Sequence, residues 1–358
     1  MSATAPQSID QGRLHEFVMK AVGEMGAAMN AALIVVGDKL GLYKAMAGAG
    51  PMTSAELAAK TGTHERYVRE WLNAQAAGGF VSYDAATSRY TLPNEQAMAL
   101  ADESSPVFLP GFFEIVESAI KDVPKITEAF RSGKGVGWHE HDCGLFGGTE
   151  RFFRPNYRAH LIDEWIPALG DTEGKLKAGA TVADVGCGLG TSTILMAQAY
   201  PKSNFTGFDY HPESIERARD AAKTAGVSDR VKFDVAKAKD YPGRGYDLVA
   251  FFDCLHDMGD PEGAAKHVRQ TLDADGAWMI VEPFANDKTE DNLNPIGRVF
   301  YAASTMLCTP ASLAQEVGLG LGAQAGEGRL SKILRSAGFT SVRRAAETPF
   351  NIVLEARP

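Results

Sequence analysis

The sequence predicts an α/β protein, with a doubly wound, mostly parallel sheet of seven strands and a second, helical domain in front of it. Strand-like and helix-like runs alternate after about residue 180, which is the pattern of a parallel sheet covered by helices. Helix-like patterns dominate the residues before that point, apart from a short hairpin pattern near residue 85. With 358 residues, 45% apolar and 23% charged, the chain is long enough for about two globular domains.

Charge and cysteine content exclude several classes of protein. The 36 basic and 45 acidic residues give a net charge of −9, which argues against broad binding to nucleic acid or anionic membranes. No two of the four cysteines form a CxxC pair, so we expect reduced thiols and no structural zinc ribbon. The N-terminus has no signal-peptide pattern, and the most apolar run, Ala31–Val36, is far shorter than the ~20 residues of a membrane span. We therefore expect a cytoplasmic protein without a membrane segment.

Residues 13–95 form the first predicted domain. Apolar residues recur every three or four positions from Arg13, so we expect a helix there. The apolar helical pattern continues over Ala27–Leu42 and ends at the glycine-rich break before Pro51. This face is rich in Met and Ala, which favours packing against a neighbouring helix or a partner chain.

Two further helices are marked by their caps. Thr53 and Glu56 form a capping-box pattern, and the helix that they open ends at Gly62. Thr63 is the expected cap of the next helix, over residues 63–77.

A hairpin pattern completes the first domain. Short β-type runs at 80–83 and 89–92 follow the helices, and helix, turn, helix and hairpin is the order of a winged helix. A winged helix that reads DNA usually presents net positive charge. The helix 63–77 carries charges that sum to zero, namely Glu65, Arg66, Arg69 and Glu70. We therefore favour a dimerisation module over a DNA-binding one.

The remaining chain divides into a helical linker, 96–175, and a sheet domain, 176–358. The linker, with its aromatic residues, is the candidate for one wall of a substrate pocket. An insertion at 286–335 is the natural cap of that pocket. The strand-like runs lie at 181–185, 204–209, 230–235, 246–252, 277–282, 340–344 and 351–356. The last two are too close for a parallel crossover, so one of them is expected to be antiparallel.

A glycine-rich turn follows the first strand of the sheet. Gly186, Gly188 and Gly190 form a G-x-G-x-G pattern, with Thr191 where the dinucleotide fingerprint has its third glycine. Asp184, just before the turn, would repel a pyrophosphate and attract a cation such as an ammonium or a sulfonium. A nicotinamide oxidoreductase is disfavoured for these two reasons.

A second carboxylate ends the next strand. Asp209 follows Asp184 by 25 residues, which suits one βαβ step, and it can accept both hydroxyls of a ribose. The two carboxylates and the turn between them suit a nucleoside that carries an amino acid and no phosphate.

This pattern resembles that of class I S-adenosylmethionine-dependent methyltransferases, and the strand plan is similar to their Rossmann-like fold from about residue 150 onward. The whole chain resembles bacterial methyltransferases with an N-terminal winged-helix domain, which are related in plan to plant small-molecule O-methyltransferases. The resemblance implies S-adenosylmethionine as the cofactor, a small-molecule acceptor and a homodimer, with no nucleic acid and no membrane as partners.

The resemblance also implies which residues hold the cofactor. The methionine end would lie on the glycine-rich turn, the ribose on Asp209, and the adenine near Tyr210. The implied cofactor residues are Asp184, Gly186, Gly188, Gly190, Thr191, Asp209, Tyr210, Val235, Ala236, Phe252, Asp253 and Tyr157. Many relatives place an acid near the adenine amino group, whereas this chain has Lys237 there; Asp234 or Asp240 are the possible substitutes.

His256 is the candidate catalytic base. It follows the fourth strand, at the sheet edge where doubly wound folds bind ligands. His256-Asp257 matches the histidine and aspartate that deprotonate the acceptor hydroxyl in the plant enzymes, although Met258 replaces their usual Trp. Glu282 matches the acid that orients this histidine. The alternative is a structural histidine, with methyl transfer driven by alignment alone.

The segment 138–143 contains residues of the types that bind metals, namely His139, His141 and Asp142. We expect no metal there, because their spacing would suit a strand whereas the glycines before them indicate a loop.

The function that the sequence predicts is methyl transfer to a small acceptor, with a hydroxyl as the best guess. The alternative is a ligand-sensing winged-helix regulator whose methyltransferase-like domain no longer reacts.

Overall fold

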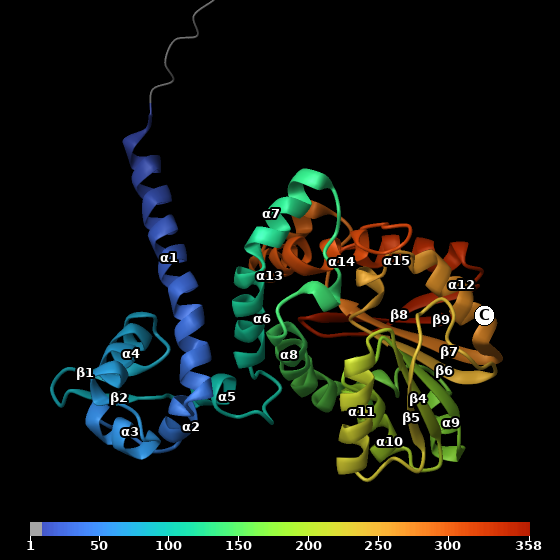
Figure 1. The fold of residues 1–358 in the computed structure, drawn as a ribbon, viewed down its shortest axis with the longest axis horizontal. Helices are drawn as coiled ribbons and strands as arrows, with labels where there is room; N and C mark the ends of the chain where they lie inside the picture. Colours follow the sequence, from blue (N-terminus) through green and yellow to red (C-terminus); the bar gives the residue numbers. More distant parts are fainter. Residues whose placement is uncertain (1–8) are drawn as a thin grey trace, which may run out of the picture. The chain divides into compact units, whose positions relative to one another are not determined.

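The computed structural model describes residues 9–358, which divide into two compact units, one up to Glu117 and one from Ser118 to Pro358 (Figure 1). Each unit has its own hydrophobic core. The first core contains residues of the helices and hairpin up to Leu100, and the second unit has one core on each face of its sheet.

The first unit is helical, with one small hairpin whose strands pair antiparallel. Its elements are α1 (Gln11–Lys39), α2 (Leu42–Met46), α3 (Ser54–Thr61), α4 (Glu65–Ala77), β1 (Ser82–Asp84), β2 (Arg89–Thr91), α5 (Asn94–Leu100) and α6 (Pro110–Lys121), the last of which crosses the boundary between the units. The structure thus confirms the order of a winged helix.

The caps of this unit show how local chemistry sets the helix ends. Thr53 and Glu56 form a reciprocal capping box, and Gly62 ends α3 with a φ of 63°. The expectation that Thr63 caps the next helix is wrong. His64 is the cap instead, its Nδ1 accepting from the Arg66 amide, while the Thr63 hydroxyl lies 2.8 Å from that of Thr61.

The helix α1 leaves most of its apolar side chains exposed within this unit. Its buried residues lie near its C-terminal end, with Ile34 fully buried. By length and composition, α1 is the one helix among residues 9–358 that is long and apolar enough to cross a membrane. Soluble core helices and leader sequences pass the same test. The sequence estimate based on Ala31–Val36 was too narrow, because Gly, Ala and Met extend the apolar stretch over several turns.

The second unit is built on a seven-stranded sheet with the order β5-β4-β3-β6-β7-β9-β8. Only β9 runs antiparallel to its neighbours, as the short connection before it predicts. The strands are β3 (Thr181–Val185), β4 (Asn204–Asp209), β5 (Val231–Val235), β6 (Tyr246–Phe252), β7 (Leu272–Pro283), β8 (Ser341–Glu347) and β9 (Asn351–Arg357).

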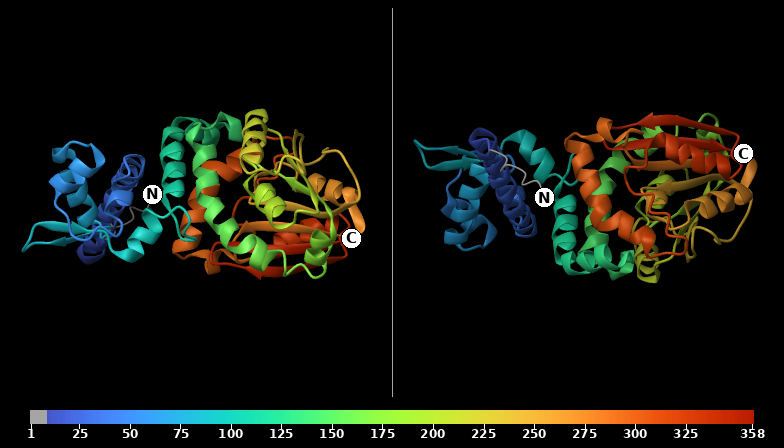
Figure 2. Two further views of the ribbon diagram at one scale, coloured as in Figure 1. Left: turned by 90° about the horizontal axis from the view of Figure 1, so that it is seen from below. Right: turned by 90° about the horizontal axis from the view of Figure 1, so that it is seen from above.

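Helices cover both faces of this sheet (Figures 1 and 2). The helical elements are α7 (Val123–Ser132), η1 (Trp138–Glu140), α8 (Gly144–His160), η2 (Leu161–Trp165), α9 (Thr172–Ala178), α10 (Thr191–Ala199), α11 (Pro212–Thr224), η3 (Leu255–Asp257), α12 (Pro261–Thr271), η4 (Thr289–Asn292), α13 (Pro295–Ala303), η5 (Ser304–Cys308), α14 (Thr309–Leu313) and α15 (Gly326–Ser336).

The two faces share strands but bury alternate side chains. In β6, Leu248 and Phe252 pack with α8, α10 and α11, whereas Val249 and Phe251 pack with α12 and α15. Both faces are therefore apolar, as a doubly covered sheet requires. The strand order reverses direction on either side of β3, and the crevice beyond the carboxyl ends of such strands is where these folds bind ligands.

Candidate cofactor and active site

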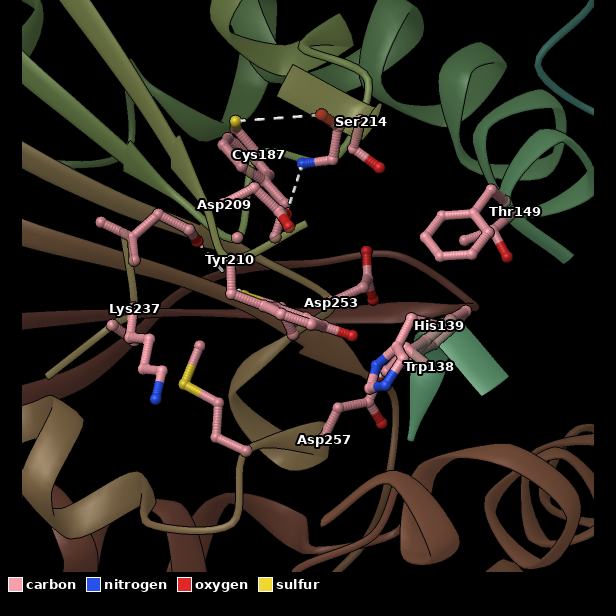
Figure 3. Close-up of a pocket in the computed structure, with 18 of the residues that line it drawn as sticks. Trp138, His139, Thr149, Cys187, Asp209, Tyr210, Ser214, Lys237, Asp253 and Asp257 are labelled. Carbon is pink, nitrogen blue, oxygen red and sulfur yellow. Dashed lines mark hydrogen bonds between the residues drawn. The ribbon is translucent and has the colours of Figure 1, made fainter. Parts of the chain in front are cut away.

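A cavity of about 580 Å³ opens in this crevice, and every residue that lines it belongs to the second unit. Its walls come from the ends of β3, β4, β5 and β6, from η1 and α8, and from the residues after α14. Figure 3 shows the cavity, with Tyr210 near its middle and Trp138, His139 and Asp257 toward one end. Cavities of this size hold ligands such as nucleoside cofactors.

The glycines of the turn after β3 have different roles. Gly186 and Gly188 line the cavity, both with positive φ, and a Cβ on Gly188 would meet nothing within 4 Å. A Cβ on Gly186 would lie 2.7 Å from the sulfur of Cys254. Gly190 does not line the cavity; there a Cβ would lie 2.6 Å from the ring of Phe233. Gly190 thus allows close packing of α10, while Gly188 leaves open space for a ligand.

Asp209 ends β4 and lines the cavity. The Gly188 amide donates to its Oδ2 at 3.0 Å, and the His211 amide donates to its Oδ1 at 2.9 Å. Burial is the main reason that the pKa of Asp209 is raised. Each carboxylate oxygen keeps a second lone pair, so the fixed carboxylate can still accept hydroxyl hydrogens from a ribose.

Asp184 lies behind the turn rather than on the cavity wall. Its Oδ2 accepts from the hydroxyls of Ser192 and Thr193, both at 2.6 Å, and its buried Oδ1 has no hydrogen-bond partner. Burial raises its pKa to about 6 despite these two hydrogen bonds. The charge of Asp184 can therefore act on a ligand through the low-dielectric interior, while Ser192, which does line the cavity, stands between them.

Asp253 is a third carboxylate, and it lies in the cavity wall after β6. It accepts from the Tyr157 hydroxyl and from the Asn351 amide, both at 2.8 Å, and adopts a positive φ of 49°. Burial, and then the charge of Glu282, raise its pKa to about 7. No lysine or arginine in the described residues pairs with Asp253, so a cationic ligand would be its natural counter-ion.

Only some of the residues predicted to lie near the adenine are in the cavity wall. Tyr210 and Ala236 line it, whereas Val235 is half-exposed and does not. Lys237 also lines the cavity; Asp240 turns instead to accept from the Lys237 amide at 3.1 Å. Asp234, the other candidate acid, lies 3.6 Å from Arg219 and is likewise not in the wall.

Other predicted cofactor residues are in the wall. These are Thr191, Phe252 and Tyr157, and Tyr157 packs against Phe252 with ring centroids 5.2 Å apart.

His256 lies in η3, buried beside the cavity rather than in its wall. Its Nδ1 lies 2.6 Å from Oε2 of Glu282, whose Oε1 accepts from the Leu255 amide at 2.9 Å. The structure thus brings the predicted base and its orienting acid together at the ends of β6 and β7.

Asp257 covers the other nitrogen of His256. Its Oδ1 lies 3.2 Å from Nε2, and its Oδ2 accepts from the Trp138 indole at 2.8 Å. Burial alone would lower the pKa of His256, but the carboxylates of Asp257 and Glu282 outweigh burial and raise it well above 6.5. Of this group, Asp257 and not His256 touches the cavity.

The two histidines of segment 138–143, His139 and His141, have different surroundings. His139 lines the cavity near Tyr210, with ring centroids 6.2 Å apart. His141 is buried, and its Nδ1 lies 2.8 Å from Asp122, so the two histidines do not share a site. Asp142 instead accepts from Ser118 at 3.2 Å.

Several cavity residues had no sequence signal that would single them out. They lie on α8 (Phe146, Thr149 and Glu150), in the segment between β5 and β6 (Lys239) and on the loop after α14 (Gln315 and Glu316). Glu150 accepts from the Thr191 hydroxyl at 2.8 Å, which ties α8 to the glycine-rich turn. Only the three-dimensional fold brings these segments together.

The donor set fits S-adenosylmethionine. Gly188 leaves open space for close approach, and Asp209 is fixed with lone pairs free. Asp253, which is half-buried, and Asp184, which is buried, are carboxylates without cationic partners in the described residues. A nucleoside with a sulfonium and an ammonium would supply cationic partners for these two carboxylates.

Two family models match the chain. An Rv2258c-like winged HTH domain matches residues 28–102, and a methyltransferase domain matches residues 176–338.

Among relatives of known activity, 27-O-demethylrifamycin SV methyltransferase of Amycolatopsis mediterranei is 31% identical over 46% of this chain and 55% of its own. Norajmaline N-methyltransferase of Rauvolfia serpentina is 28% identical over 45% of this chain and 54% of its own. The chain thus spans about half the length of these relatives.

Solved structures share the fold over nearly the whole chain. An O-methyltransferase family protein from Burkholderia thailandensis has a TM-score of 0.69 at 19% identity, covering 95% of this chain and 98% of its own. Human N-acetylserotonin methyltransferase, solved with S-adenosylmethionine, has a TM-score of 0.68 at 16% identity, covering 99% of both chains. The chain thus combines a winged-helix domain with a methyltransferase domain, and it shares the fold of these solved structures.

Proposed function

We propose that this protein methylates a hydroxyl of a small molecule, with His256 as the base and Glu282 as the residue that orients it. The observation that carries the proposal is the 2.6 Å contact between Nδ1 of His256 and Glu282, beside a cavity that suits the cofactor. S-adenosylmethionine supplies the methyl group, which passes to the acceptor oxygen.

Asp257 links the base to the cavity. It lines the cavity and lies 3.2 Å from Nε2 of His256, so the acceptor proton reaches the histidine by way of this carboxylate. The Trp138 indole fixes the second carboxylate oxygen, and the closed apolar surroundings strengthen these interactions. His256 and Asp257 therefore act as one proton-accepting pair, which must lose a proton before it can accept another.

The acceptor class follows from the relatives and from the cavity. The two relatives act on rifamycin and ajmaline-type molecules, as their names state, and both are small-molecule methyltransferases. Aromatic side chains such as Phe146, Phe153 and Trp138 line this cavity. We infer a small, partly apolar acceptor with a ring system.

The proposal is tested by methyl transfer from labelled S-adenosylmethionine to a panel of phenols and other hydroxylated aromatic compounds. In Glu282→Gln, an amide N–H would face Nδ1 and favour the wrong tautomer, so we expect turnover to fall by about 10²–10⁴-fold. Cofactor binding should be retained, since Glu282 does not line the cavity. Unchanged turnover in a folded Glu282→Gln protein would rule out the proposed base.

We also infer a cytoplasmic homodimer that associates through residues 13–95. The apolar side chains that α1 exposes within its unit support this, including Phe17, Met25 and Met29. Light scattering at micromolar concentration should give twice the chain mass. A monomer, or a protein recovered in the membrane fraction, would contradict the inference.

A ligand-sensing regulator is the second candidate, because the winged-helix model matches residues 28–102. The charges of α4 argue against it: Arg66 pairs with Glu70, and Arg69 with Glu65, which leaves no net charge for phosphate. Binding to duplex DNA that weakens with salt would favour the regulator.

A further inference from the structure

Three buried side chains of different chemistry meet beside the cofactor cavity. They are His256 and Asp257 of η3 and Cys308 at the end of η5, and one ligand atom from each lies within 4.8 Å of the others. The exposed fractions of the three residues are only 4%, 7% and 7%. Elements that are far apart in sequence thus converge on one point.

One buried oxygen atom of this cluster lacks a hydrogen-bond partner. Oδ1 of Asp257 is buried and makes no hydrogen bond, although it faces Nε2 of His256 at 3.2 Å. The ion pairs of Asp257 and Glu282 in the described residues are with His256 alone, so two buried carboxylates share one imidazole. A buried negative charge without full compensation is costly, and a bound cation would relieve it.

His256 and Asp257 each make a second contact on the side that faces away from the cluster. Glu282 holds Nδ1 of His256 at 2.6 Å, which leaves Nε2 directed at the cluster. The Trp138 indole holds Oδ2 of Asp257 at 2.8 Å, which leaves Oδ1 directed there too. This carboxylate–histidine arrangement is the one that orients histidine ligands in metal sites.

The donor atoms select the kind of ion. An imidazole nitrogen, a carboxylate oxygen and a thiolate sulfur suit Zn²⁺ and its spectroscopic substitute Co²⁺, whereas Mg²⁺ and Ca²⁺ prefer oxygen alone. Three protein ligands leave a fourth position open, and Asp257 borders the cavity from which a water molecule or another ligand could fill it.

We propose that His256, Asp257 and Cys308 form a binding site for one Zn²⁺-type ion, through Nε2, Oδ1 and Sγ. On binding, the Cys308 thiol loses its proton to solvent and becomes a thiolate ligand, and an imidazolium likewise loses its Nε2 proton. The ion occupies the nitrogen that the proposed reaction uses. If the proposed function holds, bound Zn²⁺ therefore inhibits methyl transfer reversibly, and a chelator restores the activity.

The direct test is titration of the full-length reduced protein with Co²⁺, which needs no acceptor and no turnover. We expect one equivalent to bind and to give the near-ultraviolet thiolate-to-cobalt absorption of a Co–S bond. Cys308→Ala should lose this absorption, and Cys143→Ala, which changes an exposed cysteine, should keep it. Zn²⁺ should displace the Co²⁺ and abolish the signal.

A second variant guards against misfolding of Cys308→Ala. Trp138→Phe keeps all three ligands but removes the hydrogen bond to Asp257, so it should weaken Co²⁺ binding by about 10–100-fold. No cobalt–thiolate absorption in the folded wild type, or the same absorption in Cys308→Ala, would overturn the site. Cobalt binding in a protein that methylates nothing would leave the site in place and refute the proposed function instead.

Discussion

Replacing Asp253 by asparagine should stabilise the cofactor-free protein and weaken its affinity for a cation. Asp253 is half-buried in the cavity wall, and its pKa is raised from 3.8 to about 7, first by desolvation and then by the charge of Glu282. Asparagine has the same shape, tolerates the positive φ of this position, and can keep hydrogen bonds to Tyr157 and Asn351. The exchange therefore removes mainly the charge.

The magnitude follows from the pKa. A folded-state pKa above the unfolded value means that the folded protein holds the proton more tightly, so the free energy of unfolding falls as pH rises from about 4 to about 7. A difference of 3.2 units corresponds to about 4 kcal/mol at pH 8, and to less than about 2 kcal/mol at pH 5. Asp253→Asn lacks this penalty. For a unit of this size, its melting temperature at pH 8 should rise by up to about 8–16 °C.

The assay is thermal unfolding by circular dichroism at pH 5 and pH 8, with and without S-adenosylmethionine. The control is Asp163→Asn, which changes an exposed aspartate of η2 and should alter stability by less than about 0.5 kcal/mol. The ligand should stabilise the wild type at pH 8 more than it stabilises Asp253→Asn. If the variant is no more stable than the wild type at pH 8, or gains equally at both pH values, the pKa of Asp253 is not raised in the folded protein.

Two further predictions concern the base and the glycine-rich turn. His256→Ala should bind S-adenosylhomocysteine with unchanged affinity but lose turnover by about 10²–10⁴-fold, measured as transfer of labelled methyl. Equal losses of affinity and turnover would show that His256 supports the cofactor site instead. Gly190→Ala should lower the free energy of unfolding by more than about 2 kcal/mol, because its Cβ would lie 2.6 Å from Phe233. Gly188→Ala, whose Cβ meets open space, should lower it by only about 1 kcal/mol. Denaturant unfolding that ranks the two glycines in the opposite order would contradict this assignment.

Much of the fold follows from short-range patterns in the sequence. The strands β3, β4 and β6 begin and end where their apolar runs do, because buried parallel strands are continuous apolar segments between glycine-rich or polar breaks. Helix ends with strong local chemistry, such as the Thr53 capping box, were equally predictable. The cap of α4 was not, since Thr63 and His64 are both able to accept the first amides, and the Thr63 hydroxyl lies against that of Thr61 instead.

The candidate site was predictable where it lies on the strand ends. Asp209 ends β4, Tyr210 follows β4 and Asp253 follows β6, and the topology brings them to one edge. The position of Asp257 over His256, and the approach of Trp138 and Cys308, depend on how distant segments pack, which no local pattern encodes.

The most direct test of the account is calorimetric titration with S-adenosylhomocysteine of the wild type, Asp209→Ala and Asp209→Asn. We expect one site of micromolar affinity in the wild type. Asp209→Ala should bind at least about tenfold more weakly, because hydrogen bonds from ribose hydroxyls to a carboxylate contribute about 1.5–3 kcal/mol each. Asp209→Asn should fall between the two. A folded wild type that does not bind S-adenosylhomocysteine would contradict the assignment of the glycine-rich turn and Asp209 as the cofactor site.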